Sequence, residues 1–382
     1  MGSDAFEIAI NLIKLVFIFL IMVQLVPVLV WAERRGSAFI QNRFGPNRVG
    51  PLGLMQLLAD AVKFIFKEEF VPQKSVAFLY YAAPVIALIP AALAFAAIPL
   101  SSPIHVEAFH WLGQTWGPYI FHIQGYSVGV GIVFVLGVSS LATYSLLLAG
   151  WGSSNKYSLL GAMRASAQVI SYELALGLSL VGALLIYGTF SFQSMIHQQI
   201  GPLTFHWLGQ PHVISWLPNW GIFYQPLGCL LFFAATFAES NRLPFDLAEA
   251  EGELVAGYHT EYGGFKMLMF YIGEYGHMLV ASSLVVTFYF GGYMIPLVSY
   301  HSIYGALLGW TGMPTAASIV AALLLNIVFF IKVFILLWVF IWVRWTLPRF
   351  RYDQLMDLGW KTMLPWALLN AVVTSGFVLL GR

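Results

Sequence analysis

The side chains with the clearest chemical potential are the carboxylates gathered between residues 239 and 262. Only 9% of the chain is charged, yet this stretch surrounds a single Arg242 with acids. The acids are Glu239, Asp246, Glu249, Glu251, Glu253 and Glu261. Leucine, phenylalanine and valine residues alternate with them, which a solvated acidic loop would not favour. The stretch therefore predicts a functional site rather than a solvated loop.

Three further ionisable side chains, Glu173, Glu274 and Lys332, lie within long apolar segments. Charges inside a membrane are costly, so they usually face a bundle interior or a wet cavity and often mark ion or proton paths. The alternative is a structural Glu–Lys pair, but one carboxylate would then be left over. Desolvation favours the neutral form of that carboxyl, which could then take up and release protons near neutral pH. Glu239 and the acids after it would extend these groups to the membrane surface.

The elements that must position these acids are membrane-spanning helices. Hydrophobic residues make up 59% of the chain, and the mean hydropathy is +0.80. Crossing a hydrocarbon core needs about 20 apolar residues, and the backbone in lipid must pair internally as a helix. Eight segments qualify, at roughly 8–31, 76–99, 126–150, 165–189, 222–238, 266–291, 316–342 and 359–380. We predict an all-α integral membrane protein, one polytopic domain over residues 1–382 with about eight transmembrane helices.

The distribution of basic residues predicts the orientation of these spans. Fifteen of the 18 Lys and Arg residues lie in or beside the loops after spans one, three, five and seven. The opposite loops, 100–125, 190–221 and 292–315, contain none. The positive-inside rule places the basic loops inside and both termini outside.

Composition also narrows the possible partners and cofactors. A net charge of +1 without a basic stripe gives no reason to expect nucleic acid. The single Cys229 excludes metal centres built on several cysteines within this chain. The outer loops are rich in His and Trp, but no carboxylate or cysteine cluster accompanies the histidines, so we expect no metal site.

The first inner loop combines a turn-rich run with an amphipathic helix. Gly and Pro residues between positions 45 and 51 predict turns, and a helix of about 16 residues is expected from Pro51. Its polar face is formed by Gln56, Asp60, Lys63 and Lys67, with apolar residues on the other side. Such a helix lies in the membrane interface. It either rests on lipid headgroups or forms a wall of a cavity that opens at the membrane surface.

Three motifs now carry a resemblance to a known family. One is Ala32-Glu-Arg-Arg with Gly45-Pro-Asn-Arg-Val-Gly-Pro-Leu-Gly-Leu-Met-Gln and Ala59-Asp-Ala-Val-Lys-Phe. The second is the whole acidic stretch from Ala238 to Tyr262, and the third is Pro348-Arg-Phe-Arg-Tyr-Asp-Gln-Leu-Met. Together with the eight spans, they resemble the membrane component of respiratory complex I that is called the H subunit in bacteria and chain 1 in mitochondria. Leu57, where that family often has proline, and the long outer loops depart from the pattern.

The resemblance implies a subunit that joins the membrane arm of the complex to its redox arm. Quinone, the substrate, would enter from the bilayer beside the first inner loop. By match, the quinone tunnel would be formed by Glu33, Arg34, Arg43, Asp60, Ala61, Lys63, Phe64 and Arg344. The proton path would comprise Glu173, Glu239, Asp246, Glu249, Glu251, Glu253, Glu274 and Lys332. No cofactor is expected to bind covalently, because flavin and iron–sulfur centres belong to partner subunits.

The same resemblance implies a location and leaves alternatives open. The chain would sit in an energy-transducing membrane, the bacterial inner membrane, among the other complex I subunits and lipid. It would contribute to a proton-translocating NADH:quinone reductase without activity alone. One alternative is the membrane anchor of a related hydrogenase-type complex, and another is a stand-alone ion-coupled transporter. The sequence leaves open whether NADH, ferredoxin or F420 donates the electrons, and which quinone accepts them.

Overall fold

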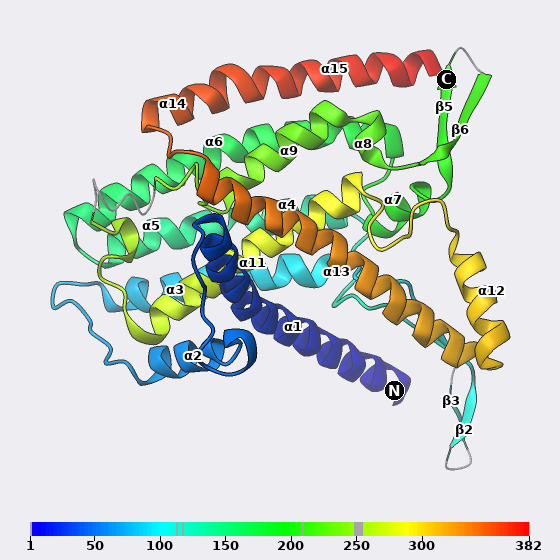
Figure 1. Cartoon of the computed structure of the whole chain (residues 1–382), viewed down its shortest axis with the longest axis horizontal. Coiled ribbons are helices and arrows are strands. Elements are labelled where there is room, and N and C mark those ends of the chain that lie inside the picture. The colour runs from blue at the N-terminus through cyan, green and yellow to red at the C-terminus, as the bar shows by residue number, and fades with distance from the viewer. Residues whose placement is uncertain (1, 112–113, 117, 208–209, 248–254, 382) are drawn as a thin grey trace.

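Long helices form most of the protein in the computed structural model, which describes residues 2–111, 114–116, 118–207, 210–247 and 255–381. The principal helices are α1 (Gly2–Ile40), α3 (Ala77–Ala97), α4 (Gly131–Ser140), α5 (Ala142–Gly152), α6 (Lys156–Tyr187), α9 (Pro226–Glu239), α11 (Gly264–Tyr289), α13 (Pro314–Thr346) and α15 (Leu364–Gly381). Figure 1 shows most of them running side by side between two ends of the molecule. This arrangement confirms the predicted all-α membrane fold.

Within the described residues, six helical segments are long and apolar enough to cross a membrane. They contain α1, α3, α4 with α5, α6, α13 and α15. The other two predicted spans fall on α9 and α11. α9 has only 14 residues. α11 has 26 residues, which corresponds to about 39 Å of helix. The count of eight therefore remains a prediction for these two helices.

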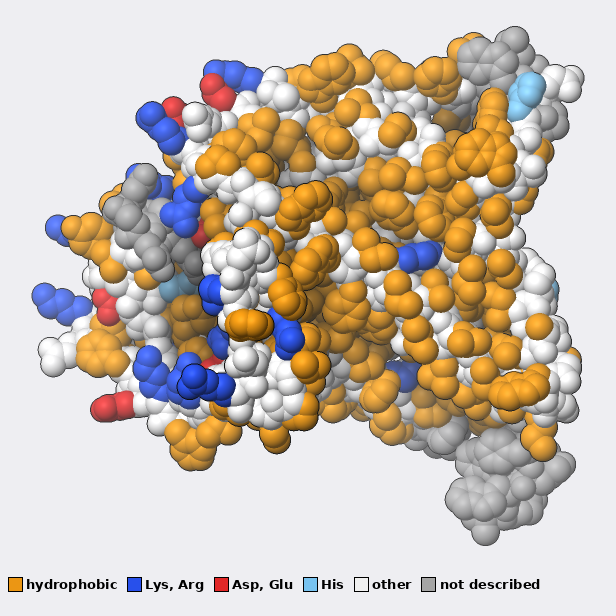
Figure 2. Space-filling view, in the orientation of Figure 1, with side chains coloured by type: hydrophobic (Ala, Val, Ile, Leu, Met, Phe, Trp, Pro, Cys, Tyr) orange, Lys and Arg blue, Asp and Glu red, His pale blue; other side chains and the backbone are white. Residues whose placement is uncertain are grey.

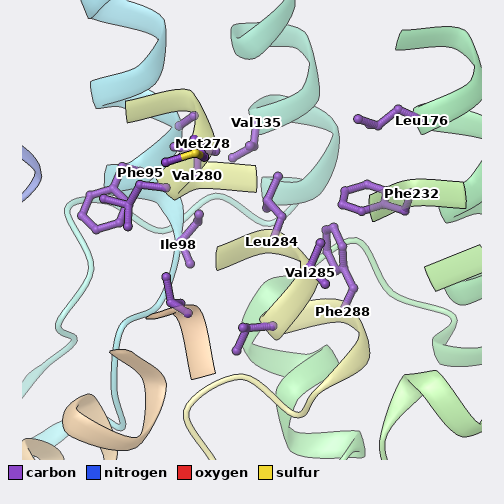
Figure 3. Close-up of a cluster of buried hydrophobic side chains, with 14 of the residues drawn as sticks. Phe95, Ile98, Val135, Leu176, Phe232, Met278, Val280, Leu284, Val285 and Phe288 are labelled. Atoms are coloured by element: carbon purple, nitrogen blue, oxygen red, sulfur yellow. The ribbon is translucent and has the colours of Figure 1, made fainter. Parts of the chain in front are cut away.

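α11 lies at the centre of the bundle and packs against α1, α3, α9 and α13. Figure 3 shows apolar side chains of α11 within a cluster of buried residues from neighbouring segments. The labelled residues are Met278, Val280, Leu284, Val285 and Phe288 of α11, with Phe95, Ile98, Val135, Leu176 and Phe232 around them, and all are buried. Polar residues elsewhere on α11 are thereby held deep in the protein.

A glycine allows α11 to approach α3 closely. A Cβ atom at Gly273 would lie 2.9 Å from the backbone oxygen of Ala87. Small residues at helix contacts are the usual means of close packing in membranes, where van der Waals contact rather than water exclusion drives association. Gly273 precedes Glu274, so this close approach also fixes the depth of that carboxylate.

Charged residues gather at one end of the molecule, while its sides are mostly apolar (Figure 2). Both chain termini lie at the opposite end (Figure 1). We call these the charged end and the far end. The basic inner loops of the sequence analysis correspond to the charged end.

The amphipathic helix lies at the charged end as α2 (Gln56–Phe66). The predicted start at Pro51 is wrong, because Pro51–Gly53 form a separate 3₁₀ turn, η1. Leu52 and Gly53 both have positive φ, at 55° and 75°, so an α-helix cannot continue through them. A Cβ atom at Gly53 would also lie 2.1 Å from the backbone oxygen of Pro46. Lys67 consequently follows α2 as its C-cap.

The far end contains short elements that the sequence analysis did not predict. Three antiparallel pairs join β1 (Ile104–Val106) to β4 (Tyr119–Phe121), β2 (Phe109–Trp111) to β3 (Gln114–Trp116), and β5 (Pro202–Trp207) to β6 (Gln210–Pro218). Short helices α7 (Phe192–Gln198), α8 (Gly221–Tyr224) and α12 (Tyr300–Thr311) accompany them. Elsewhere in the described part of the chain, short elements include η2 (Gly257–His259), α14 (Tyr352–Asp357) and the π-helical η3 (Leu358–Met363).

Candidate functional site

The first carboxylate site surrounds Glu33 on α1. Glu33 is 8% exposed and accepts a hydrogen bond from the hydroxyl of Tyr275 on α11 at 2.6 Å. Its other oxygen pairs with the guanidinium of Arg344 on α13. Arg242, in the loop after α9, lies 3.8 Å from Glu33 and 4.0 Å from the centre of the Tyr275 ring. We call these four residues the Glu33 cluster.

Electrostatics explains the composition of the Glu33 cluster. A buried charge is tolerated only where opposite charges and hydrogen bonds replace water. Glu33 has two guanidinium groups and one hydroxyl around it. These partners surround the Glu33 carboxylate and tie together elements far apart in sequence. Through Glu33, the contacts with Tyr275 and Arg344 connect α1 to α11 and α13.

A second ionic contact joins α1 to α2. Arg34 lies 2.5 Å from Asp60, which also accepts a hydrogen bond from Gln56 at 3.2 Å. Lys63 is 3.5 Å from the same carboxylate. Partial burial tends to raise the pKa of Asp60, but the hydrogen bond and charge of Arg34 outweigh it and hold this pKa below its ordinary value. The polar face of α2 is thus turned towards α1.

The other predicted tunnel residues also lie at the charged end. Arg43 follows α1 and donates to Gln41 at 2.6 Å. Phe64 meets the ring of Tyr271 on α11 edge-on, with centroids 6.3 Å apart, and Ala61 is half-buried on α2. The structure therefore pairs Glu33 with Arg344, and it pairs Asp60 with both Arg34 and Lys63. It places Arg43 on a separate turn.

The second carboxylate site is a small cavity among α3, α5, α6, α9 and α11. Its wall includes Ser139, Thr143, Glu239, Tyr258, Glu274 and His277. The centres of water molecules can occupy about 30 Å³ of it. A single water needs roughly 10–15 Å³ by this measure, so the cavity has room for water. We call it the acidic cavity.

The acids of this cavity contact hydroxyl and imidazole groups. Tyr258 donates to Glu274 at 2.5 Å, and Nε2 of His259 is 3.8 Å from the same oxygen. Thr143 donates to Glu173 at 3.2 Å, and Glu173 is close enough to Glu239 to repel it. The structure thus brings two predicted membrane carboxylates, Glu239 and Glu274, to the wall of one cavity, and a third, Glu173, into contact with the lining residue Thr143.

The remaining predicted path residues are more scattered. Asp246 is buried and pairs with Arg349 at 3.2 Å, which joins the acidic stretch to the loop after α13. Glu261 accepts a hydrogen bond from Asn155 at 2.6 Å. Glu249, Glu251 and Glu253 lie outside the described residues.

Lys332 on α13 contacts backbone carbonyls. Its ammonium donates to Phe290 at 2.8 Å, Gly292 at 2.9 Å and Met294 at 2.6 Å. Phe290 is the C-cap of α11, where unpaired carbonyls and the helix dipole favour a cation. These contacts lie at the end of α11 remote from Glu274. Lys332 therefore fixes a helix end, and its described contacts include no carboxylate.

Several site residues were missed by the sequence analysis. They are Ser139, Thr143, Tyr275 and His277. Arg242 and Tyr258 lie within the stretch 239–262 that the sequence analysis singled out, but it gave them no role. Tyr275 and His277 carried a local signal, since they follow Glu274 by one and three positions on the same helix. Ser139 and Thr143 are brought in by helices distant in sequence. Among the described residues, no group of three or more His, Cys, Asp or Glu side chains is placed to hold a metal ion.

The fold and these two carboxylate sites define a polytopic membrane protein with ionisable groups deep in its helix bundle. Comparison with known proteins identifies the family. The sequence profile described as NADH dehydrogenase matches residues 13–375. The NADH-quinone oxidoreductase H subunit of Bdellovibrio bacteriovorus is 67% identical over 375 residues, which cover 98% of this chain and 97% of that protein.

More distant relatives agree. The corresponding H subunit of Salinibacter ruber is 42% identical over 92% of each chain. The second H subunit of Geobacter sulfurreducens is 41% identical over 100% of this chain and 99% of its own. This chain belongs to the family of NADH-quinone oxidoreductase H subunits, which are membrane components of complex I. The resemblance drawn from the three sequence motifs is confirmed.

Proposed function

We propose that this chain forms the quinone tunnel of a proton-translocating NADH:quinone oxidoreductase together with an acidic path that couples quinone reduction to proton pumping. The tunnel residues are Glu33, Arg34, Arg43, Asp60, Ala61, Lys63, Phe64 and Arg344. The path residues are Glu173, Glu239, Asp246, Glu249, Glu251, Glu253, Glu274 and Lys332. The chain acts as one subunit among others and has no activity alone.

One observation carries the proposal: neighbouring residues of α11 serve the two carboxylate sites. Tyr275 donates to Glu33 at 2.6 Å, while Glu274 lines the acidic cavity and accepts from Tyr258 at 2.5 Å. A change in charge beside Glu33 therefore acts on the same helix turn that holds a cavity acid. This is the contact that a coupling mechanism requires.

The tunnel part of the mechanism begins at α1 and α2. Quinone arrives from the bilayer along these helices, with Ala61 and Phe64 contacting its apolar tail. Arg34, Arg43 and Lys63 shape the mouth by charge. Reduction of the headgroup takes two electrons and two protons and occurs mainly at residues of partner subunits. Those partners also carry the flavin and iron–sulfur centres that deliver the electrons.

The path part begins where the headgroup changes its charge. That change alters the field on Arg344 and Arg242, which hold Glu33 and Tyr275. The response passes along α11 to Glu274 and, across the acidic cavity, to Glu239 and Glu173. Lys332 holds the other end of α11, so that the helix moves as one element. Glu249, Glu251 and Glu253 extend the acids beyond Asp246.

We propose that the chain crosses the bacterial inner membrane with both termini outside. The apolar sides of the molecule, the single charged end and the shared location of the termini support this orientation (Figures 1 and 2). Ser154 and His301 are exposed at opposite ends. In intact cells, an impermeant thiol reagent should label His301→Cys but not Ser154→Cys, and the reverse pattern would overturn the orientation.

The coupling proposal is tested with Glu239→Gln, which removes a proton-exchanging group but keeps its shape and hydrogen bonding. Quinone reduction and proton uptake by inverted vesicles should fall together by about tenfold or more. NADH:ferricyanide activity and subunit content should stay normal. Asp357→Asn, at an exposed pair with Lys361, serves as the carboxylate control. A fully assembled Glu239→Gln complex with normal turnover and normal pumping would contradict the proposed carboxylate path.

A further inference from the structure

His277 stands out in the wall of the acidic cavity because it belongs to neither set of proposed residues. It follows Glu274 by three positions on α11 and therefore lies on the same helix face. Glu239 and Tyr258 form other parts of the same wall. Thr143, which binds Glu173 at 3.2 Å, completes the surroundings of the cavity.

One nitrogen of the His277 imidazole lacks a hydrogen-bond partner in the described part of the chain. Nε2 of His277 is buried and finds no hydrogen-bond partner among the described residues. Buried polar atoms in native proteins are nearly always paired, with water where no side chain is available. A cavity with about 30 Å³ for water centres adjoins the ring, and water in a polar site needs two to four polar partners. Glu239, Glu274 and Tyr258 offer such partners beside His277.

We propose that the acidic cavity holds water and that His277 is a proton-relay residue between Glu274 and Glu239. This inference rests on the proposed acidic path and adds a member of a different chemical type. A carboxyl group changes its charge when it passes a proton on. Imidazole can instead accept a proton at one nitrogen while it releases another from the second nitrogen.

The relay balances protons at every step. Neutral His277 accepts a proton at its free nitrogen from cavity water that has been protonated by Glu274. The resulting imidazolium releases the proton at its other nitrogen to water beside Glu239. Rotation of the ring restores the starting tautomer. The groups that set the field at His277 are Glu173, Glu239, Glu274, Tyr258 and His259.

The test compares variants of the intact complex in inverted membrane vesicles. His277→Gln keeps a hydrogen-bonding side chain but cannot carry a proton. It should lower quinone reduction and proton uptake roughly tenfold, while NADH:ferricyanide activity and subunit content stay normal. Ser283→Ala is the matched control, since Ser283 is buried on the same helix and, among the described residues, its side chain donates to the backbone oxygen of Leu279 at 2.8 Å.

Chemical rescue separates a relay from a structural role. His277→Ala leaves space for a free imidazole molecule beside the cavity. Added imidazole should raise the turnover of His277→Ala several-fold, whereas an apolar additive of the same size, such as cyclopentane, should not. Failure of rescue combined with normal turnover of His277→Gln overturns the relay.

A second variant tests the water without altering any ionisable group. Ala142 lines the cavity, and Ala142→Val fills part of its volume with carbon. Proton uptake should fall as in His277→Gln, so this variant decides the matter if His277 variants fail to assemble. Normal turnover of both His277→Gln and Ala142→Val, with Glu239→Gln impaired, removes the relay and leaves the acidic path standing. Normal turnover of all three removes the path as well.

Discussion

The Glu33 cluster and the acidic cavity meet at adjacent residues of α11, yet the surroundings of their buried carboxylates are opposite. Glu33 meets two guanidinium groups and a tyrosine hydroxyl. The described contacts of Glu173 and Glu274 are hydroxyl and imidazole groups. Strong positive partners fix a charge, whereas neutral donors and nearby acids leave the protonation state open. The Glu33 cluster thus gives its carboxylate charged partners, whereas the acidic cavity gives its carboxylates hydroxyl groups and an imidazole, which fits the proton exchange that we propose for the cavity.

In the coupling that we propose, the Glu33 cluster transmits a change of charge at the quinone mouth through α11, and the acidic cavity answers by changing its protonation. Tyr275 and Glu274 are the neighbouring residues of α11 at which the two sites meet.

The largest expected effect is on stability, from Glu33→Gln. This change leaves the buried Arg242 and the partly exposed Arg344 without their shared anion, and removing one partner of a buried ion pair costs about 3–5 kcal/mol. Thermal denaturation of the purified complex should show early loss of this subunit. Glu274→Gln should leave thermal stability nearly unchanged. Equal destabilisation by both variants would erase the contrast between the sites.

Removing a single tyrosine hydroxyl from each carboxylate site tests the difference between the two sites with a smaller structural change. Tyr275→Phe removes a hydrogen bond to the charged Glu33, which contributes about 1.5–3 kcal/mol. Its main effect should be a lower unfolding temperature. Tyr258→Phe removes the contact to Glu274 and should instead lower proton-coupled turnover several-fold with little loss of stability. Thermal scans and turnover assays of both variants check this, and a swapped pattern would contradict it.

The quinone mouth provides a variant that touches neither carboxylate site. Arg43 lies on the turn after α1 and bonds to Gln41. Arg43→Ala should lower quinone reduction several-fold, mainly through a raised KM for quinone, while NADH:ferricyanide activity persists. Gln41→Ala, which frees Arg43 without removing its charge, should have a milder effect. If both activities of Arg43→Ala fall together at normal subunit content, the tunnel role is wrong.

Hydropathy and motifs predicted most of the fold, because each depends on local sequence. The predicted span 316–342 lies inside α13, and the family was identified from three motifs. The predicted start of α2 was wrong because Leu52 has a positive φ, which a leucine does not indicate in the sequence. The glycine that follows it, in contrast, is a residue type that often adopts positive φ. The far-end pairs β1–β4 and β2–β3 were missed because their strands have only three residues each.

The contacts of the sites were less predictable, since they join residues distant in sequence. Tyr275 and Glu33 are 242 positions apart. Lys332 was expected near the carboxylates, but the geometry of α13 brings it to carbonyls 38 to 42 positions away. The acids themselves were predictable because a carboxylate in an apolar segment is conspicuous. His277 was detectable only by its spacing from Glu274.

The smallest expected effect concerns pH and the contact between α1 and α2. The pKa of Asp60 is held below its ordinary value because the hydrogen bond and charge of Arg34 outweigh the opposing effect of burial. A carboxyl group with a lowered pKa in the folded state stabilises the fold above its unfolded pKa, which is about 3.9, and loses that contribution as the pH falls through the folded value. The contact should therefore be constant between about pH 8 and pH 5 and weaken only in stronger acid.

A spin label at Leu58→Cys, an exposed position on α2, reports this contact in the intact complex. Its mobility should rise only in acid below the ordinary carboxyl pKa of about 3.9, because the pKa of Asp60 is held below that value. Asp60→Asn, which cannot ionise, should show the higher mobility at every pH and no acid transition. A transition near neutral pH that Asp60→Asn abolishes would mean that Asp60 exchanges protons as the cavity acids are proposed to do. The α1–α2 contact would then belong with the acidic cavity rather than with the fixed charges of the Glu33 cluster.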